Sequence, residues 1–388
     1  MPSVSISRPE VALNSNVSRS YSILRLLLQI RETSAPYNQL SLAWPNHQSI
    51  TICTYFKSQI RHSQEIRVFD GDGTLSGFFR GLSAALKHKA YDVIHVHAPH
   101  LGLLFLIANI LPHRGLLRTA VYTVHNSYQS YNWRHRVMLI PIFAFFQKVV
   151  FCGQASFESF PRWFRWLARG RVCAVQNGID LARVDRVLGV DGRSGPKGNF
   201  TIAVVGRLIP IKNSLSVLLA FQQSDDQSGH LLLIGEGHLR DSLLAKTRQM
   251  GLDGRVRFTG LIPRNQVYEL LSRADLFISA SRGEGLPISV LEAMACRCPV
   301  LLSDIPPHRE LARGMDFIPL IPPDDIAAFA REIKRFREMP SSERVEIGEK
   351  CRNLVEERFS LTAMHRRYEE VYADVLSHAA QTLRVSQK

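Results

Sequence analysis

Short apolar runs alternate with segments of helical periodicity along most of the chain. The runs are three to eight residues long, and several are bounded by Gly, Asn or Asp. They lie at residues 23–30, 50–56, 66–69, 93–96, 119–124, 149–152, 172–175, 201–205, 231–234, 256–258, 276–278 and 300–302. Most precede a helical pattern, such as residues 77–89 or 266–274. This alternation predicts an α/β protein with parallel sheets covered by helices on both faces.

The alternation occurs twice, on either side of a polar, glycine-rich stretch. We therefore predict a Rossmann-like domain over residues 1–185, a linker over 186–199 and a second Rossmann-like domain over 200–361. Residues 362–379 carry apolar side chains at helical spacing and predict one further amphipathic helix. Two doubly wound sheets joined in this way would face each other across a cleft. Ligands of such folds bind there, at the carboxyl ends of the strands.

The charge of the chain is distributed unevenly. Of the 388 residues, 45% are hydrophobic and 21% are charged, a composition that excludes disordered and fibrous proteins. The formal net charge is +14, and residues 1–190 hold 21 basic and 9 acidic side chains against 27 and 25 in the remainder. The partner that this basic surface attracts should therefore bind the first half. Nucleic acid, an anionic membrane and an acidic substrate are the candidates.

The sequence shows no segment for export or for membrane insertion. The first twenty residues are polar, so we expect no secretory signal peptide. The longest apolar runs, residues 101–111 and 137–146, fall short of the roughly 20 residues that a membrane span needs. Six cysteines in a chain of this length form no disulfide framework. These features favour a cytoplasmic protein with reduced thiols.

Two loops of the second domain combine strand ends with groups that can bind anions. Arg207 and Lys212 follow the first strand of this domain, just before a helix that Asn213 or Ser214 would cap. Two cations beside a helix N-terminus can bind an anion such as a diphosphate, although Arg and Lys are also common on solvated loops. Gly235 lies in a Gly-x-Gly turn whose backbone either approaches a phosphate or only makes a tight turn.

A third loop combines glycines with the first of two glutamates. Glu284 lies on this loop, Pro287 is placed to begin a helix, and Glu292 lies inside that helix. The amides of Gly285 and Leu286 would then point from the helix N-terminus toward an anion. Glu292 lies in the apolar run ISVLEAMA, where a buried carboxylate needs a partner such as ligand hydroxyls. An ordinary, partly exposed helix glutamate is the alternative.

Together these segments resemble a known family. EGLPISVLEAMA, with two glutamates eight residues apart and followed by CPVLLSD, resembles the retaining family-4 glycosyltransferases of the GT-B fold, also called glycosyl transferases group 1. VGRLIPIKN and LLLIGEGHLRDSLLAK match that family in the second half, as do DVIHVHAPH, YTVHN and VQNGID in the first. The resemblance extends over roughly residues 91–310. It implies a hexosyltransferase built from two Rossmann-like domains that face each other across a cleft.

The resemblance implies roles for particular residues. Arg207 and Lys212 would hold the diphosphate of a nucleotide-sugar and neutralise it as it leaves, and Glu284 would bond hydroxyls of the donor sugar. Glu292 would accept from the ribose, and His125, at the cleft end of a first-domain strand, would contact the sugar and the reacting region. The remaining donor-binding positions are the backbones of Gly235, Gly285 and Leu286.

The resemblance also implies a reaction without a metal or a cofactor, because the Arg–Lys pair takes the place of a divalent cation. The acceptor would be a hydroxyl of a saccharide or of a lipid-linked molecule, in the assembly of a surface polysaccharide or glycolipid. The helix at 362–379 would pack back onto the first domain. The loop at 31–37, RETSAPY, lacks the glycines usual after the first strand of the family, so it must approach its ligand differently.

A phosphatase is the main competing function. FDGDGT resembles the first motif of the Mg²⁺-dependent haloacid-dehalogenase-type phosphatases, in which Asp70 would be the nucleophile and both Asp70 and Asp72 would bind the metal. Against this, two predicted strands precede the motif, whereas in that family it ends the first core strand. An Asp-Gly-rich turn is the simpler interpretation.

A metal site and a non-catalytic binding protein are two further alternatives. His95 and His97 share a strand face and, with His100, suggest a metal site, but no carboxylate or cysteine set accompanies them. A catalytically inactive, basic membrane-binding or nucleic-acid-binding protein would explain the charge. It would leave the two spaced glutamates unexplained, and no nucleic-acid recognition motif is present.

Two segments of the first half mix aromatic residues with cations. Residues 131–136 read YNWRHR and precede the apolar run 137–146, and residues 161–171 read PRWFRWLARGR. Tryptophans among arginines suit the headgroup region of an anionic bilayer, although a solvated surface helix shares this pattern. We therefore expect a cytoplasmic protein that is peripheral on the inner face of the cytoplasmic membrane, with no nucleic-acid partner.

Overall fold

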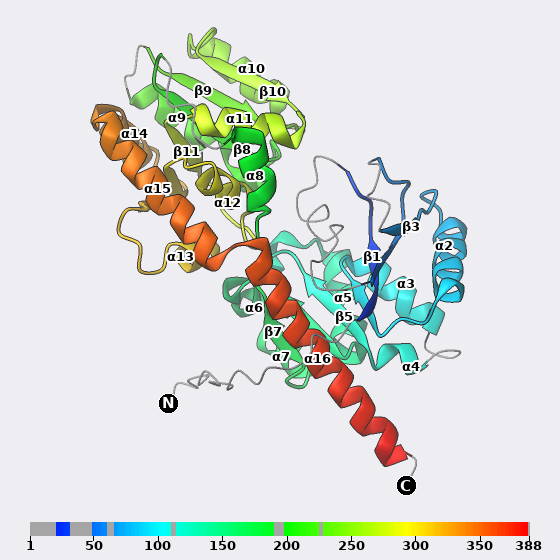
Figure 1. Ribbon diagram of the computed structural model, residues 1–388. Helices are drawn as coiled ribbons and strands as arrows, with labels where there is room; N and C mark the ends of the chain where they lie inside the picture. The colour runs from blue at the N-terminus through cyan, green and yellow to red at the C-terminus, as the bar shows by residue number, and fades with distance from the viewer. Residues whose placement is uncertain are drawn as a thin grey trace.

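The computed structural model describes residues 21–31, 49–59, 66–109, 114–189, 198–224 and 228–386. Two parallel β-sheets with helices packed on them form the two halves of the molecule (Figure 1). This is the α/β architecture of two Rossmann-like units that the alternating pattern predicts. Most of the loop at 31–37 and of the linker at 186–199 lies outside the described residues.

The first sheet has seven parallel strands in the order β3-β2-β1-β4-β5-β6-β7. The strands are β1 (Ser22–Leu27), β2 (Ser49–Thr54), β3 (Arg67–Phe69), β4 (Val93–Val96), β5 (Ala120–Val124), β6 (Lys148–Phe151) and β7 (Val172–Ala174). The helices are α2 (Leu75–His88), α3 (Pro99–Asn109), α4 (Arg114–Leu117), η1 (Tyr128–Ser130), α5 (Trp133–Phe145), α6 (Gln154–Ser159) and α7 (Arg162–Leu167). The next helix, α8 (Leu181–Leu188), packs against the core of the second half. The strand order reverses beside β1, which creates a crevice at the carboxyl ends of β1 and β4.

The second sheet has six parallel strands in the order β10-β9-β8-β11-β12-β13. The strands are β8 (Thr201–Val205), β9 (His230–Ile234), β10 (Val256–Gly260), β11 (Leu276–Ser279), β12 (Val300–Ser303) and β13 (Leu320–Ile321). The helices are η2 (Pro210–Lys212), α9 (Ser214–Gln223), α10 (Arg240–Gln249), α11 (Arg264–Arg273), α12 (Ile288–Ala295), α13 (Pro306–Leu311), α14 (Ile326–Glu338) and α15 (Ser341–Arg358). The sequence pattern misses β13, because it spans two residues between two prolines.

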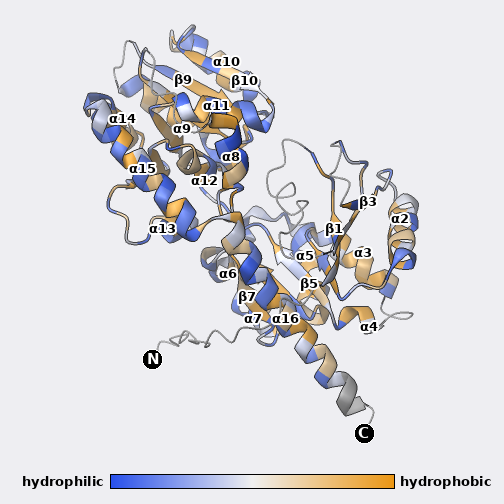
Figure 2. Ribbon diagram, in the orientation of Figure 1, coloured by the Kyte–Doolittle hydropathy of each residue, from blue (hydrophilic) through white to orange (hydrophobic). Residues whose placement is uncertain are grey.

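The last helix, α16 (Leu361–Ser386), returns from the second half and lies along the first sheet (Figure 1). Alternate residues of the central strands face α16, and the residues between them face α2, α3 and α5, so α16 covers the opposite side of the sheet. Figure 2 shows the hydrophobic strands between these helix layers. The helix continues beyond the predicted 362–379 because apolar periodicity marks only its packed part. Its buried hydrophobic side chains are Met364, Tyr368, Val371, Tyr372 and Val375.

Polar side chains also join α16 to the first sheet. The two ring nitrogens of His95 lie 2.7 Å from Tyr372 Oη and 2.8 Å from Thr123 Oγ1, and Thr123 Oγ1 lies 3.0 Å from Tyr368 Oη. All four side chains are buried. Because such groups must find partners inside the protein, this network fixes the register of α16 on the sheet.

No helix in the described part of the chain combines the length and the apolar character that crossing a bilayer requires.

Glu310 of α13 links the second half of the molecule to the first. Its carboxylate accepts from the backbone N–H groups of Gln154 (3.0 Å) and Ala155 (2.8 Å), at the start of α6, and from Nε2 of Gln176 (2.8 Å). Gly153 lies directly against it, since a Cβ at this position would come within 3.0 Å of Glu310 Oε2. One buried carboxylate thus satisfies the free N–H groups of a helix start in the other half.

Glu310→Ala should lower the free energy of unfolding by about 1–3 kcal/mol, because three donors lose their acceptor at a buried contact. Urea denaturation followed by circular dichroism measures this loss. Glu158→Ala is the matched control, since it removes an exposed carboxylate from α6 and should change the stability by less than about 0.5 kcal/mol. Equal effects of the two substitutions would contradict the linking role of Glu310.

Candidate active site

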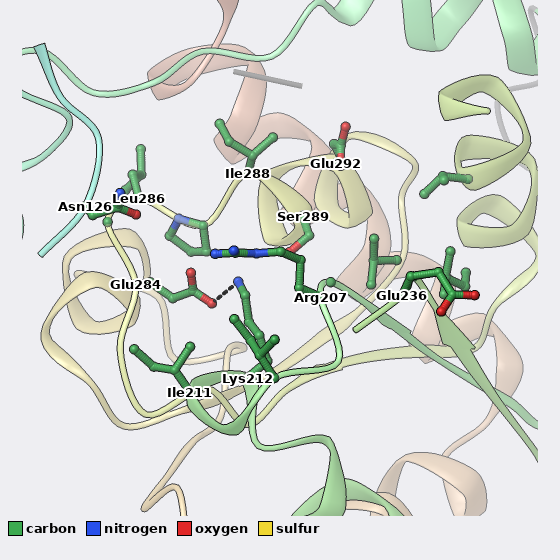
Figure 3. A pocket seen from close by; sticks show the side chains of 18 of the residues that line it. Asn126, Arg207, Ile211, Lys212, Glu236, Glu284, Leu286, Ile288, Ser289 and Glu292 are labelled. Carbon is green, nitrogen blue, oxygen red and sulfur yellow. Dashed lines mark hydrogen bonds and ion pairs between the residues drawn. The ribbon is translucent and has the colours of Figure 1, made fainter. Parts of the chain in front are cut away.

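A cavity of about 740 Å³ opens where the carboxyl ends of the two sheets face each other. Most of its wall comes from the loops after β8, β9, β10 and β11 and from the start of α12 (Figure 3). The volume lies in the range of sites for small organic ligands. The first half contributes a smaller part of the wall, made of His125, Asn126, Ser130 and Asn177.

The cations Arg207 and Lys212 both line this cavity from the loop after β8. The loop is held against the third glycine-containing loop, since the backbone N–H of Arg282 donates to the carbonyl of Ile211 at 2.8 Å. Figure 3 shows the side chains of Arg207 and Lys212 extending toward the same space beside Glu284. The structure therefore brings together the two cations and the glutamate that the sequence singles out.

Lys212 and Glu284 form an ion pair inside the cavity. Lys212 Nζ lies 2.6 Å from Glu284 Oε1, and the same oxygen accepts from Ser281 Oγ at 2.7 Å. Burial would raise the pKa of Glu284, but the charge of Lys212 and these hydrogen bonds outweigh it and hold the pKa below its ordinary value. Glu284 is therefore ionised at neutral pH. Because both contacts fall on Oε1, the geometry presents Oε2 as an acceptor for a ligand.

Gly235 allows two loops of the second half to touch. Its φ of +137° lies in a region that residues with side chains rarely adopt, and a Cβ there would come within 2.1 Å of the Gly206 carbonyl oxygen. The Gly206 N–H in turn donates to the Ile234 carbonyl at 3.0 Å. The glycine is thus required for the close approach of the loops after β8 and β9, and its backbone lines the cavity.

Gly285 and Leu286 lie against the first half of the molecule. A Cβ on Gly285 would come within 2.1 Å of the His125 carbonyl oxygen, so only glycine fits at this contact. The same Cβ would come within 3.0 Å of Cys152 Sγ, so Gly285 packs against two residues of the first half. The roles of the Gly285 and Leu286 amides toward an anion stay predictions.

Two of the loops run into helices close to the predicted starts. α9 begins at Ser214, and Asn213 before it has a left-handed backbone (φ 54°, ψ 35°). The prediction that Pro287 begins a helix is wrong by one residue, because its ψ of 98° is extended. Pro287 contributes only its carbonyl, which accepts from the Val290 N–H at 3.1 Å. The start of α12 lines the cavity, at Ile288.

Glu292 of α12 lines the cavity and has a protein partner that the sequence pattern misses. Arg264 Nη1 of α11 lies 2.7 Å from Glu292 Oε2, and Tyr268 Oη lies 3.4 Å from Oε1. Burial raises the pKa of Glu292, and the charge of Arg264 offsets part of that rise. The only signal for this partner was the placement of Arg264 and Tyr268 on one face of a helix. The contact of Glu292 with a ribose stays a prediction.

Arg264→Met should lower the free energy of unfolding by about 2–3 kcal/mol at about pH 8, because it leaves a buried carboxylate without its cation. The loss should be smaller at about pH 5. A carboxyl whose pKa is higher in the folded than in the unfolded state destabilises the fold increasingly as the pH rises, and at low pH it is protonated in both states. Urea denaturation at the two pH values measures the difference.

The control for this prediction is Arg273→Met, which removes an exposed cation from the other end of α11. It should change the stability by less than about 0.5 kcal/mol at both pH values. A loss in Arg264→Met that does not depend on pH would show that the substitution acts through packing and not through Glu292.

His125 follows β5 and lies on the first-half side of the cavity. Burial lowers its pKa to about 4, so the ring is neutral at pH 7. Its Nε2 lies 3.1 Å from Nδ1 of His97, a buried residue that follows β4. One of these two nitrogens must carry the proton of the shared hydrogen bond, so His97 restricts the tautomer of His125. In the sequence, the signal for this contact is that His97 follows β4, the strand that pairs with β5.

The aspartates of the phosphatase-like motif form local contacts outside the cavity. Asp70 accepts from Thr54 Oγ1 at 2.8 Å, and Asp72 accepts from the Thr74 N–H at 2.9 Å and from Arg80 at 3.0 Å. Thr74 is the N-cap of α2, and its hydroxyl accepts from the Gly77 N–H. Asp72 therefore stabilises the turn before α2, and Asp70 joins the end of β3 to the end of β2, so both carboxylates have structural contacts in this Asp-Gly-rich turn.

The three histidines of the suggested metal site have separate environments. His95 belongs to the network under α16, His97 contacts His125, and His100 of α3 packs edge-on against Tyr55, with 6.0 Å between ring centres. Within the described ranges, no three His, Cys, Asp or Glu side chains lie close enough together to hold a metal ion.

Two Rossmann-like units with a cation-lined cavity between their strand ends define the GT-B class of proteins. A family described as Glycosyl transferases group 1 matches residues 192–355, and one described as Glycosyltransferase Family 4 matches residues 52–183. The chain belongs to this family of group 1, family 4 glycosyltransferases and is a nucleotide-sugar glycosyltransferase. The competing phosphatase and inactive-protein interpretations are therefore set aside.

The fold is similar to solved structures over nearly its whole length. The structure of Anabaena HepE in complex with UDP and glucose superimposes with a TM-score of 0.73 at 19% identity, covering 91% of this chain and 100% of that one. Sucrose-phosphate synthase from Thermosynechococcus elongatus gives a TM-score of 0.72 at 18% identity, covering 92% and 99%. At such identities the likeness establishes the fold.

Two enzymes of related sequence are similar to about three quarters of this chain. The UDP-Gal:alpha-D-GlcNAc-diphosphoundecaprenol alpha-1,3-galactosyltransferase of Escherichia coli is 24% identical over 312 residues, which are 75% of this chain and 77% of that enzyme. The GDP-mannose:cellobiosyl-diphosphopolyprenol alpha-mannosyltransferase of Komagataeibacter xylinus is 25% identical over 309 residues, or 76% and 74%. The names of both relatives specify nucleotide-sugar donors and polyprenol-linked acceptors.

Proposed function

We propose that this protein transfers a hexose from a nucleoside-diphosphate sugar to a hydroxyl of a lipid-linked acceptor, with retention of the anomeric configuration. The observation that carries the proposal is the Lys212–Glu284 ion pair beside Arg207 in the cavity. This arrangement combines cations for a diphosphate with an ionised acceptor for sugar hydroxyls. The names of the relatives support an acceptor attached to a polyprenol diphosphate, in the assembly of a surface polysaccharide.

Departure of the nucleoside diphosphate develops negative charge on the oxygen that leaves the sugar carbon. Arg207 and Lys212 would stabilise that charge, and Lys212 is already fixed by Glu284, so little reorganisation is needed when the bond breaks. Glu284 would use Oε2 to accept from a hydroxyl of the donor sugar and so orient it. Glu292, held by Arg264, would accept from the ribose hydroxyls.

The neutral His125 would form a hydrogen bond with the sugar from the acceptor side of the cavity. The backbones of Gly235, Gly285 and Leu286 would complete the donor site. No metal or cofactor enters this scheme, because the two cations meet the diphosphate directly. We place the reaction at the cytoplasmic face of a membrane, where a lipid-linked acceptor is available.

A thermal-shift screen over UDP-, GDP- and ADP-sugars tests the proposal. One donor class should raise Tm, because a ligand at about 100 times its Kd stabilises the native state by about 2.7 kcal/mol. The shift should persist with a metal chelator and disappear in Lys212→Ala. If no nucleotide-sugar raises Tm, the donor site is wrong. A Mg²⁺-dependent phosphatase activity abolished by Asp70→Asn would instead support the competing function.

A further inference from the structure

Three neighbouring helices of the first half carry large apolar side chains that face solvent. α3 packs beside α5 and α5 beside α7, in the layer on the sheet face opposite α16. The exposed apolar residues of these helices, here called the outer apolar surface, are Ile107, Trp133, Val137, Ile140, Phe145, Trp163 and Trp166. Trp133 and Trp166 are 69% and 73% exposed. A concentration of such residues in one layer indicates an interaction site.

α5 shows most clearly that the outer apolar surface is separate from the side chains that pack against the sheet. Its inner side buries Leu139, Ile142 and Phe143 against the sheet. Its outer side presents Trp133, Val137 and Ile140, which are four and three residues apart and so form a second apolar stripe. A surface helix of a globular protein normally has one apolar stripe and an opposite polar face. The outer stripe therefore lacks an explanation from folding alone.

The charged residues of the segment that carries the outer apolar surface are almost all positive. Residues 93–179 contain nine Lys and Arg and a single acidic residue, Glu158. The guanidinium of Arg134 lies 5.5 Å from the centre of the Trp133 ring, in a cation–π contact. Arg162 and Arg169 are exposed at either end of α7. The surface thus combines apolar side chains with cations that have few acidic neighbours.

We propose that the outer apolar surface docks onto an anionic phospholipid leaflet. The tryptophans and aliphatic side chains enter the boundary between headgroups and acyl chains, and the surrounding arginines bind lipid phosphates. A second copy of the chain fits less well, because a self-paired surface would bring like charges together. Nucleic acid would meet the arginines but would leave the apolar stripe exposed to water.

Docking through this surface would bring the cavity to the bilayer. Ser130 lines the cavity, and Trp133 follows three residues later, at most about 11 Å away along the chain. The acceptor side of the cavity therefore opens next to the first membrane-inserted side chain. A lipid-linked acceptor could then reach the cavity without leaving the leaflet. The delivery of a lipid-linked acceptor rests on the proposed function, whereas the docking rests only on the outer apolar surface.

The test is sedimentation of the full chain with vesicles, without any nucleotide-sugar present. The protein should bind vesicles that contain phosphatidylglycerol and should bind pure phosphatidylcholine vesicles at least about tenfold more weakly. Trp133→Ser/Trp166→Ser should reduce partitioning onto the anionic vesicles about tenfold or more. Leu215→Ser/Val345→Ser, which alters exposed apolar residues of the second half, should leave it unchanged.

Tryptophan fluorescence provides a second readout, since three of the four tryptophans lie in the outer apolar surface. Their emission should shift to shorter wavelength on anionic vesicles and be quenched by brominated lipids. Should the double serine variant fail to fold, Arg134→Glu/Arg162→Glu should abolish binding at low salt.

The proposal is overturned if the protein does not bind anionic vesicles at low salt, or if binding survives the serine substitutions. It is also overturned if the same side chains cause the protein to self-associate while it does not bind vesicles. A thermal shift with the nucleotide-sugar, measured in parallel, separates a failure of docking from a failure of the proposed function.

Discussion

Lys212→Ala and Arg207→Ala should each lower kcat about a hundred- to a thousandfold, a loss of about 3–4 kcal/mol of transition-state stabilisation. In the proposed reaction both cations face the place where the departing diphosphate gains charge. A third cation that lines the cavity, Arg264, is paired with Glu292. Initial rates with the donor found in the thermal-shift screen measure the effect. Glu284→Ala should also lower the rate, because it removes both the anchor of Lys212 and the acceptor for the sugar.

Arg207→Ala and Lys212→Ala should have different effects on Tm. The comparison therefore distinguishes a loss of catalysis from a loss of stability. Arg207 is exposed, so its removal should leave Tm unchanged. Lys212→Ala leaves the largely enclosed carboxylate of Glu284 without its cation, so Tm should fall along with kcat. Arg248→Ala, an exposed cation of α10 outside the cavity, should alter neither quantity. Full activity in both cation variants would disprove the assigned site.

Acidification from about pH 7.5 to about pH 5 should lower the free energy of unfolding by up to about 10 kcal/mol, the sum over five buried histidines. Burial lowers the pKa of His125 and of His308 to about 4 and that of His365 to about 3. It also lowers the pKa of His95 and His97 well below the ordinary value. The unfolded chain takes up protons on these residues below about pH 6.5, whereas the folded protein does not, so stability is lost as the pH falls.

Each of these histidines accounts for a loss of about 2 kcal/mol of unfolding free energy at about pH 5. That pH lies about 1.5 units below the pKa of a histidine in the unfolded chain. Urea denaturation at the two pH values measures the total. His308→Gln should reduce the pH effect by about 2 kcal/mol, since glutamine does not titrate. His238→Gln, at an exposed position, serves as the control. A stability that is the same at both pH values would contradict the burial of uncharged histidines.

The elements that depend on local pattern could be predicted from the sequence. Short apolar runs between helical patterns locate the strands of both sheets, with the exception of β13, whose two residues are too short to form such a run. Arg207, Lys212 and Glu284 could be assigned to one cavity because parallel strands place the loops after their carboxyl ends at the same edge. Pro287 was misplaced by one residue, since helix ends depend on backbone angles that a sequence only restricts.

The partners of the site residues could not be predicted, because they lie on other elements. Glu292 meets Arg264 only because α12 packs beside α11, and His125 meets His97 only because β4 and β5 are adjacent. Glu310 reaches α6 across the boundary between the two halves. Residue spacing shows which side chains share a helix face or follow a strand. It does not show which elements pack together, and each of these pairs depends on that packing.

The return of α16 to the first sheet also determines the order in which a newly made chain can fold. Ile23, Ile52, Val93 and Val121 lie in the first third of the chain, yet they are covered by a helix that begins at Leu361. On the ribosome, one face of the first sheet stays uncovered until α16 has been made, and every strand of the second sheet is made before α16. The half that is made first is therefore the half that is finished last, and it is the one that needs protection from aggregation during synthesis.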